Sequence, residues 1–219
     1  MTTVRGVILD VDGTLVDSND AHAHAWVEAL AEYGHQVPFE EVRRLIGMGG
    51  DKLLPKVAGI KKDSQQGQAI DHRRGEIFKT RYLPAVRPFP QVRPLLQRMR
   101  DQGWKLVVAS SAKSDELDSL LDIAQVKDLV EATTSSNEAK NSKPSPDIVQ
   151  VALDKLGDPA QQAVMLGDTP YDVEAAAKAG VRTIAFRCGG WPDADLRGAW
   201  QVYDDPADLL AHFDQAFKE

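Results

Sequence analysis

The sequence predicts an α/β protein with a doubly wound, Rossmann-like parallel sheet and an inserted α-helical cap domain. Short apolar runs typical of buried strands alternate with helical segments at the start of the chain and from residue 91 onward, and an all-helical block lies between them. Strands that alternate with helices favour right-handed β-α-β units around a parallel sheet. We therefore expect a catalytic core made of residues 1–15 and 86–219, and a cap at 16–85.

The expected elements follow from the spacing of apolar residues along the chain. A buried strand at 5–10 precedes the cap helices, and a cluster of prolines at 84, 88 and 90 ends the helical block. The later strands are expected at 104–109, 129–133, 163–166, 182–186 and 201–203. The helices are expected at 20–34, 40–46, 52–57, 66–82, 91–102, 114–123, 146–156, 171–179 and 206–217, and the segment 193–200 as a loop with a short helix.

The composition limits the classes of function. A chain of 219 residues with 42% hydrophobic and 27% charged residues is typical of a soluble globular protein. The net charge of −7 argues against a nucleic-acid partner, and no apolar run is long enough to span a membrane. The single cysteine, Cys188, forms no internal disulfide, and the first residues lack an apolar signal segment. We therefore expect a cytoplasmic protein.

The first candidate site is the run Asp10-Val11-Asp12-Gly13-Thr14, which directly follows the apolar residues 7–9. Side chains at positions i and i+2 of an extended chain point to the same side, so Asp10 and Asp12 can share one cavity. Like charges at close range raise each other's pKa unless a cation holds them ionised, which implies a divalent metal, and oxygen ligands suit Mg²⁺. By itself, such a run is more typical of a solvated turn.

Polar residues also follow the other predicted strands. Ser110 and Ser111 follow 104–109, and Asp168 and Asp172 follow 163–166, while Lys143 stands just before a helix. Ligands of open parallel sheets bind at the carboxyl ends of the strands. A serine alone is often a helix cap, and a lysine alone is usually a solvated surface residue. Together, these segments predict a nucleophile, a hydroxyl donor, a fixed cation and further acid at one sheet edge.

In this order and spacing, the motifs resemble those of the haloacid dehalogenase superfamily, whose members are mostly Mg²⁺-dependent phosphatases. The resemblance covers nearly the whole chain, and the long gap between the first two motifs fits members with a small α-helical cap. It implies that Asp10 attacks phosphorus and forms an aspartyl-phosphate, and that Asp12 acts as general acid and base. It also implies that Ser110 and Lys143 bind the transferring phosphoryl oxygens. The implied ligands of Mg²⁺ are Asp10, the main-chain carbonyl of Asp12, and Asp168.

The remaining assignments concern positioning and substrate choice. Asp172 is expected to orient Lys143 or a metal-bound water. The residues expected to bind the substrate are Thr14, Ser111, His22 and Lys52, with the cap deciding which substrate is accepted. The expected partner is a small phosphorylated metabolite, with phosphoglycolate, a sugar phosphate and a nucleoside monophosphate all open. The expected assembly is a monomer or a homodimer.

Two alternatives to a phosphatase remain open, and two are disfavoured. Asp12 argues against the dehalogenase and phosphonate-cleaving branches of the superfamily, which lack this second acid. His22 and Trp26 match a histidine and a tryptophan of the β-phosphoglucomutase branch, but that branch usually has Glu-Asp where this chain has Gly167-Asp168, and the loop 47–52 lacks its arginine. A non-catalytic phosphoacceptor or phosphate-binding protein is the other alternative. The segment 188–191 suggests no function.

Overall fold

The chain divides into two compact units in the computed structural model, which describes residues 4–218. The first unit comprises the chain up to Asp17 and from Arg87 onward, and the second is Ser18–Val86. The cap was predicted at 16–85, and the assignment of the second unit as a cap stays a prediction.

The first unit is built on a six-stranded parallel sheet in the order β5-β4-β1-β6-β7-β8. The strands are β1 (Gly6–Leu9), β4 (Lys105–Ala109), β5 (Ala132–Thr134), β6 (Ala163–Gly167), β7 (Arg182–Phe186) and β8 (Gln201–Tyr203). Leu9 of β1 pairs with Val108 and with Leu166, so β1, β4 and β6 end level with one another. The predicted α/β fold class is therefore confirmed, with β1 at the point where the strand order reverses.

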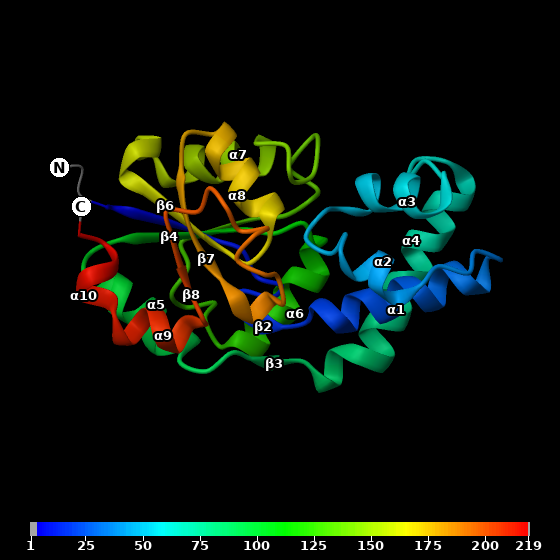
Figure 1. Cartoon of the computed structure of the whole chain (residues 1–219), viewed down its shortest axis with the longest axis horizontal. Coiled ribbons are helices and arrows are strands. Elements are labelled where there is room, and N and C mark those ends of the chain that lie inside the picture. Colours follow the sequence, from blue (N-terminus) through cyan, green and yellow to red (C-terminus); the bar gives the residue numbers. More distant parts are fainter. Residues whose placement is uncertain (1–3, 219) are drawn as a thin grey trace. The chain divides into compact units, whose positions relative to one another are not determined.

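Helices cover both faces of this sheet. They are α5 (Val92–Asp101), α6 (Ser114–Ala124), α7 (Asp147–Leu156), α8 (Pro170–Lys178), α9 (Pro206–Ala211) and α10 (Phe213–Ala216). Figure 1 shows α7 and α8 on one side of the strands and α5 and α9 on the other. Ile8, Val107 and Met165 pack with the buried residues of α7 and α8. Alternate strand residues point to opposite faces, so strands buried on both faces read as continuous apolar runs.

Four details of the first unit differ from the prediction. A two-residue strand β2 (Val16–Asp17) pairs antiparallel with β3 (Arg87–Pro88), and such short strands carry no periodic signal. Strand β5 begins three residues later than predicted. The helix expected at 206–217 is split at His212 into α9 and α10. The segment 193–200 forms turns and no helix.

The second unit is a group of helices built around α1. Its helices are α1 (Asn19–Glu32), α2 (Phe39–Arg43), α3 (Gly50–Ala58) and α4 (Gln65–Ile77), and α4 continues into the π-helical turn η1 (Phe78–Tyr82). Helix α1 contacts α2, α4 and η1, and α2 contacts α3. The core of this unit consists of buried apolar side chains at the helical spacing seen in the sequence, among them Ala23, Trp26, Leu30, Leu53, Leu54, Ile70, Ile77 and Phe78.

None of the helices within residues 4–218 combines the length and the apolar character needed to cross a membrane.

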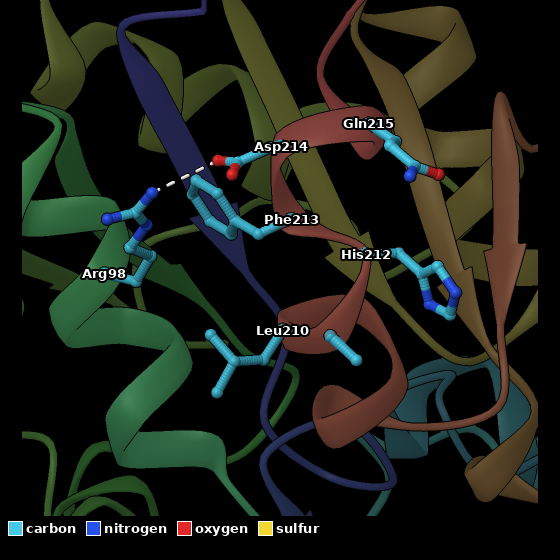
Figure 2. Close-up of a pocket in the computed structure, with 7 residues that line it drawn as sticks. Arg98, Leu210, His212, Phe213, Asp214 and Gln215 are labelled. Atoms are coloured by element: carbon cyan, nitrogen blue, oxygen red, sulfur yellow. Dashed lines mark hydrogen bonds and ion pairs between the residues drawn. The ribbon is translucent and has the colours of Figure 1, made fainter.

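A hollow of about 330 Å³ lies beside the end of the chain in the first unit. Figure 2 shows its lining residues, which are Arg98, Leu210, Ala211, His212, Phe213, Asp214 and Gln215. Arg98 is ion-paired with Asp214 at 3.1 Å, and its guanidinium carbon lies 5.4 Å from the centre of the Phe213 ring. The charge of Arg98 is already balanced there, and none of the predicted site residues lines this hollow.

Candidate active site

The loop after β1 turns back on itself and holds Asp10 at the carboxyl end of the strand. The main-chain N–H of Asp10 donates to the carbonyl of Leu166 at 2.9 Å and so extends the pairing of β1 with β6. Gly13 has a φ of 76°, and its N–H donates to the carbonyl of Val16 at 2.8 Å. Glycine adopts this left-handed conformation without a steric cost. The side chain of Asp10 is therefore buried at the sheet edge, as the spacing of the first motif predicts.

Lys143 is the buried cation of the site, with 1% of its surface exposed. Its ammonium nitrogen lies 2.5 Å from Oδ1 of Asp10 and 2.8 Å from Oδ1 of Asp172. The ammonium also donates to the main-chain carbonyl of Ala109, the last residue of β4, at 2.9 Å. A lysine is almost never fully buried unless its charge is paired, and an ammonium group has three hydrogens to donate. The three contacts therefore fix the position of this charge.

The two oxygens of Asp172 contact different parts of the site. Oδ1 faces Lys143 at 2.8 Å. Oδ2 accepts hydrogen bonds from the N–H and the hydroxyl of Thr169, at 3.0 and 2.7 Å, and from the N–H of Asp168 at 3.3 Å. The Thr169 hydroxyl in turn accepts from the N–H of Asp172, which makes a capping box at the start of α8. One carboxylate thus fixes both the loop after β6 and the lysine.

Thr14 links the loops that follow β1 and β6. Its hydroxyl donates to Oδ1 of Asp168 at 3.0 Å and lies 3.3 Å from Oδ2 of Asp10. Its main-chain N–H donates to the carbonyl of Val11 at 3.2 Å, and the residue is completely buried. All of these contacts are made within the protein, so the expected contact of Thr14 with a substrate stays a prediction.

Ser110 follows β4 directly and is completely buried. Its N–H donates to the carbonyl of Thr134 in β5 at 3.0 Å, and its hydroxyl oxygen accepts from the N–H of Ala112 at 3.0 Å. The preceding residue, Ala109, is the one whose carbonyl binds the Lys143 ammonium. Ser110 is therefore held at the same sheet edge as the lysine. Ser111 is half-buried in the same turn.

Burial and charge shift the ionisation of this cluster. Burial raises the pKa of the Asp10 carboxyl to about 7, the negative charges of Asp172 and Asp12 add to the rise, and Lys143 opposes it. Burial also disfavours the charged form of Lys143, but the attraction of Asp10 and Asp172 outweighs it and raises the pKa of the ammonium. The lysine therefore stays charged at neutral pH, whereas Asp10 needs a further cation to be fully ionised.

The acidic side chains of the cluster fit a divalent cation. Asp10, Asp168 and Asp172 are buried, and each has a carboxylate oxygen within 4.8 Å of the others. Lys143 balances only part of this buried negative charge, and uncompensated buried charge is costly. Hard carboxylate oxygens are the ligands that Mg²⁺ prefers. The half-buried side chain of Asp12 is not part of this set, and its expected contribution to metal binding is the main-chain carbonyl.

Comparison with known proteins decides the family. Residues 7–186 match the family model described as haloacid dehalogenase-like hydrolase. The chain belongs to this family. The match spans both units, and the resemblance stated from the four sequence motifs is confirmed. The protein is therefore an enzyme of the haloacid dehalogenase-like hydrolases.

Individual known proteins resemble this chain over nearly its whole length. A phosphoglycolate phosphatase from Aquifex aeolicus is 31% identical over 99% of this chain and 100% of its own length. The crystal structure of a hydrolase from Pseudomonas syringae has a TM-score of 0.91 at 26% identity and covers 98% of this chain and 100% of that chain. A putative beta-phosphoglucomutase from Bacteroides vulgatus has a TM-score of 0.87 at 24% identity over 100% of this chain and 92% of its own, a likeness of fold alone.

The cap residues expected to bind the substrate of this hydrolase lie in the second unit. His22 on α1 is buried, and its ring stacks on Phe78 with 3.9 Å between the ring centres and 12° between the planes. Lys52, near the start of α3, is half-buried. Trp26 is 5% exposed, as expected of a residue that packs in the cap core. The roles of His22 and Lys52 in substrate binding stay predictions.

Three residues of interest were missed in the sequence. Arg74 on α4 is buried in the cap, 3.8 Å from Asp71, with its guanidinium carbon 5.3 Å from the centre of the Trp26 ring. In the sequence, such a pair three residues apart looks like an ordinary surface ion pair. Thr169 was recognisable, because Thr and Asp three residues apart before an apolar run indicate a capping box. Gly189 carried no signal in the sequence.

Proposed function

We propose that this hydrolase is a Mg²⁺-dependent phosphatase that cleaves a small phosphomonoester, with Asp10 as the nucleophile. The observation that carries this proposal is the buried Asp10 carboxylate at the end of β1, 2.5 Å from the Lys143 ammonium and beside the acids of the loop after β6. A carboxylate held next to a fixed positive charge is suited to attack phosphorus and form a covalent intermediate. The name of the full-length relative, a phosphoglycolate phosphatase, supports the same reaction class.

In the first half of the proposed reaction, an oxygen of Asp10 attacks the phosphorus in line with the ester oxygen. The new bond gives an aspartyl-phosphate, and the bond from phosphorus to the ester oxygen breaks. Asp12 gives its proton to the departing oxygen, which leaves as an alcohol. Its half-buried position, two residues after the nucleophile, suits a group that must exchange protons with the leaving group and with water.

In the second half, Asp12 takes a proton from a water molecule, which attacks the phosphorus of the aspartyl-phosphate. The bond between Asp10 and phosphorus breaks, inorganic phosphate is released, and the Asp10 carboxylate is regenerated. Ser110 and Lys143 are proposed to bind the phosphoryl oxygens in both halves. Groups that are already fixed by the protein stabilise the transition state without reorganising. The three contacts of Lys143 hold its charge in place, and a phosphoryl oxygen would share the ammonium group with them.

The residues proposed to hold Mg²⁺ are Asp10, Asp168 and the main-chain carbonyl of Asp12. When bound, the cation supplies positive charge that offsets the charge of the phosphoryl oxygens. Asp172 is better suited to positioning than to ligation, because its oxygens already contact Lys143 and the start of α8. We assign Asp172 to orienting the lysine.

Substrate choice is proposed to lie outside this cluster, since the strand-end residues act only on the phosphoryl group shared by all phosphomonoesters. Ser111, and His22 and Lys52 of the cap, are the proposed contacts for the rest of the substrate. Thr14, also expected to bind the substrate, lies within the cluster instead, beside Asp10 and Asp168. The proposed substrate is a small phosphorylated metabolite. The phosphoglycolate named for the relative from Aquifex aeolicus makes that compound the first candidate.

Turnover of p-nitrophenyl phosphate with Mg²⁺ tests the proposed reaction. Asp10→Asn removes the nucleophilic charge while keeping the shape, so we expect kcat to fall by at least about a thousandfold. Asp154→Asn is the matched control, because Asp154 is exposed on α7 and bonds only Gln150 among the contacts described, and it should retain wild-type turnover. Activity that survives Asp10→Asn would overturn the mechanism.

A panel of phosphorylated metabolites then separates the remaining alternatives. Phosphoglycolate, sugar phosphates and nucleoside monophosphates are ranked by kcat/KM, and the products are identified as well as counted. Release of inorganic phosphate supports the phosphatase. Transfer of the phosphoryl group within a sugar phosphate would instead support a mutase, and binding of phosphate without turnover would support a non-catalytic protein.

A further inference from the structure

The turn that follows β7 lies directly against the candidate metal ligand Asp168. Strands β6 and β7 are parallel neighbours, with Gly167 paired to Ala185, so their carboxyl ends lie side by side. Asp168 follows β6, and the 3₁₀ turn Arg187–Gly189 follows β7. Gly189 and Asp168 are both buried. The turn 187–189 therefore forms one wall of the site, and it includes the start of the segment 188–191, for which the sequence suggested no function.

The side chain of Asp168 occupies the space that a side chain at position 189 would need. A Cβ atom added to Gly189 would lie 1.9 Å from Oδ2 of Asp168 and 2.4 Å from its Cβ and Cγ atoms. Carbon and oxygen atoms that are not bonded pack at about 3.5 Å, so the two side chains cannot coexist in this arrangement. The Asp168 carboxylate therefore packs directly against the backbone of Gly189, where no side chain is present.

The conformation of Gly189 does not explain why the residue is glycine. Its neighbour Gly190 has a φ of 88°, in the left-handed region that glycine adopts readily. Gly189 is not among the residues with positive φ, so a larger residue could adopt its backbone conformation. The requirement for glycine at 189 comes from the space that Asp168 fills.

Contacts on three sides hold the turn in place. The N–H of Cys188 donates to the carbonyl of Asp204 at 2.9 Å, just after β8. The Cys188 thiol lies 3.5 Å from the carbonyl of Gly13 in the loop after β1. The Arg187 guanidinium pairs with Asp193 at 2.7 Å and with Asp204 at 2.8 Å. Because the turn is tied to both neighbouring loops, it cannot easily move away from a displaced carboxylate.

Asp168 is therefore held between two groups. Thr14 donates a hydrogen bond to Oδ1 at 3.0 Å, and the bare backbone of Gly189 borders Oδ2. We propose that Gly189 is a positioning residue for the metal-binding carboxylate of Asp168, and that any larger side chain at 189 turns this carboxylate out of the orientation that binds Mg²⁺. This inference rests on the proposed function, in which Asp168 is a ligand of Mg²⁺.

Calorimetric titration of the metal-free full chain with MgCl₂ tests the proposal without an activity readout. We expect Gly189→Ala to raise the Kd for Mg²⁺ by about tenfold to a hundredfold, the range seen when groups that orient a metal ligand are altered. Gly75→Ala is the matched control, since a Cβ at Gly75 meets no atom within 4 Å, and its Kd should equal that of the wild type. Asp168→Asn should also weaken binding.

The titration separates the two proposals. Wild-type binding that is weakened by Asp168→Asn but unchanged by Gly189→Ala overturns the role of Gly189 alone. If the wild-type protein binds no Mg²⁺, or if Asp168→Asn leaves the Kd for Mg²⁺ unchanged, the proposed metal site is overturned and this inference with it.

A stability cycle tests the steric cause and covers the case in which Gly189→Ala folds poorly. Asp168→Gly removes the three atoms that lie nearest to the new Cβ. The fall in Tm caused by Gly189→Ala should therefore be smaller in the Asp168→Gly protein than in the wild type. If the single variant Gly189→Ala does not fold, the double variant Asp168→Gly/Gly189→Ala should still fold. An equal fall in both backgrounds, or failure of both variants to fold, overturns the proposal.

Discussion

The two units of this hydrolase bury positive charge in different ways. In the first unit, the ammonium of Lys143 lies 2.5 and 2.8 Å from two carboxylates that come from the loop after β1 and from α8. In the second unit, the guanidinium of Arg74 lies 3.8 Å from Asp71 on the same helix and faces the ring of Trp26 at 5.3 Å. The first arrangement joins distant segments by short ion pairs, and the second combines a local pair with an aromatic face.

This difference suits the tasks proposed for the two units. The strand-end cluster must present the same charges to every phosphoryl group, and a cluster held by the whole sheet keeps them fixed. The residues of the cap cluster, Trp26 on α1 and Asp71 and Arg74 on α4, all belong to the second unit, so they can change without altering the strands of the sheet. We infer that the first cluster is tied to the chemistry and the second to the stability and the selectivity of the cap.

Among tests that compare the two units, the largest expected effect comes from removing the buried lysine. Lys143→Met keeps the length of the side chain but removes the charge that opposes the raised pKa of Asp10. The proposed nucleophile Asp10 should then be protonated over a wider pH range, and the phosphoryl contact proposed for Lys143 is lost. We expect kcat on p-nitrophenyl phosphate to fall by about a hundredfold to a thousandfold, as for other fixed groups that stabilise a transition state.

Lys178→Met is the control for this variant. Lys178 is exposed on α8, pairs with Glu174 at 2.7 Å and donates to the carbonyl of Pro144, next to Lys143 in the chain. Its loss should leave kcat unchanged. Similar kcat values for Lys143→Met and Lys178→Met would show that the strand-end cluster does not carry the chemistry.

An intermediate effect is expected in the cap. Arg74→Met removes the cation beside buried Asp71 and the contact with the Trp26 ring, so we expect the free energy of unfolding to fall by about 3 kcal/mol. The adjacent Arg73 is the matched control, because it pairs with Glu32 and Glu76 at the surface, and Arg73→Met should change stability little. Urea unfolding measures both, and equal stabilities of the two variants contradict a special role for Arg74.

The smallest expected effect is a pH dependence of the metal-free protein. The pKa of Asp10 is about 7 in the folded chain and 3.8 as its ordinary value, so the folded state keeps a proton that the unfolded state loses between these values. This group's contribution to stability is therefore complete at low pH and falls as the pH rises from about 4 to about 7.

Asp10→Asn does not titrate, which isolates this contribution. In EDTA, the stability of Asp10→Asn relative to the wild type should rise by at least about 1 kcal/mol between about pH 5 and about pH 7.5. Added Mg²⁺ should restore part of the wild-type stability at the higher pH, because the cation compensates the ionised carboxylate. If the stability difference between Asp10→Asn and the wild type stays constant with pH, then burial and the charges of Asp172 and Asp12 do not raise the pKa of Asp10 as inferred.

Much of the fold was readable in the sequence because burial on both faces of a parallel sheet leaves continuous apolar runs. The strands at 182–186 and 201–203 were predicted at their observed bounds. The ribbon of β2 and β3 was missed because two-residue strands contain no period. The strand predicted at 129–133 began too early because Leu129 is buried in a turn, where its N–H donates to Val126, rather than in the sheet.

The motifs by themselves determined the family, the residue types at the strand ends and the reaction class to be tested. Only the tertiary structure decided how these groups contact one another: that Lys143 is shared by Asp10 and Asp172, and that Gly189 borders Asp168. The reason is physical. A motif records which chemical groups are present near a strand end, whereas the pairing of buried charges and the space left beside a glycine depend on segments that are distant in the chain and meet only when the sheet is formed.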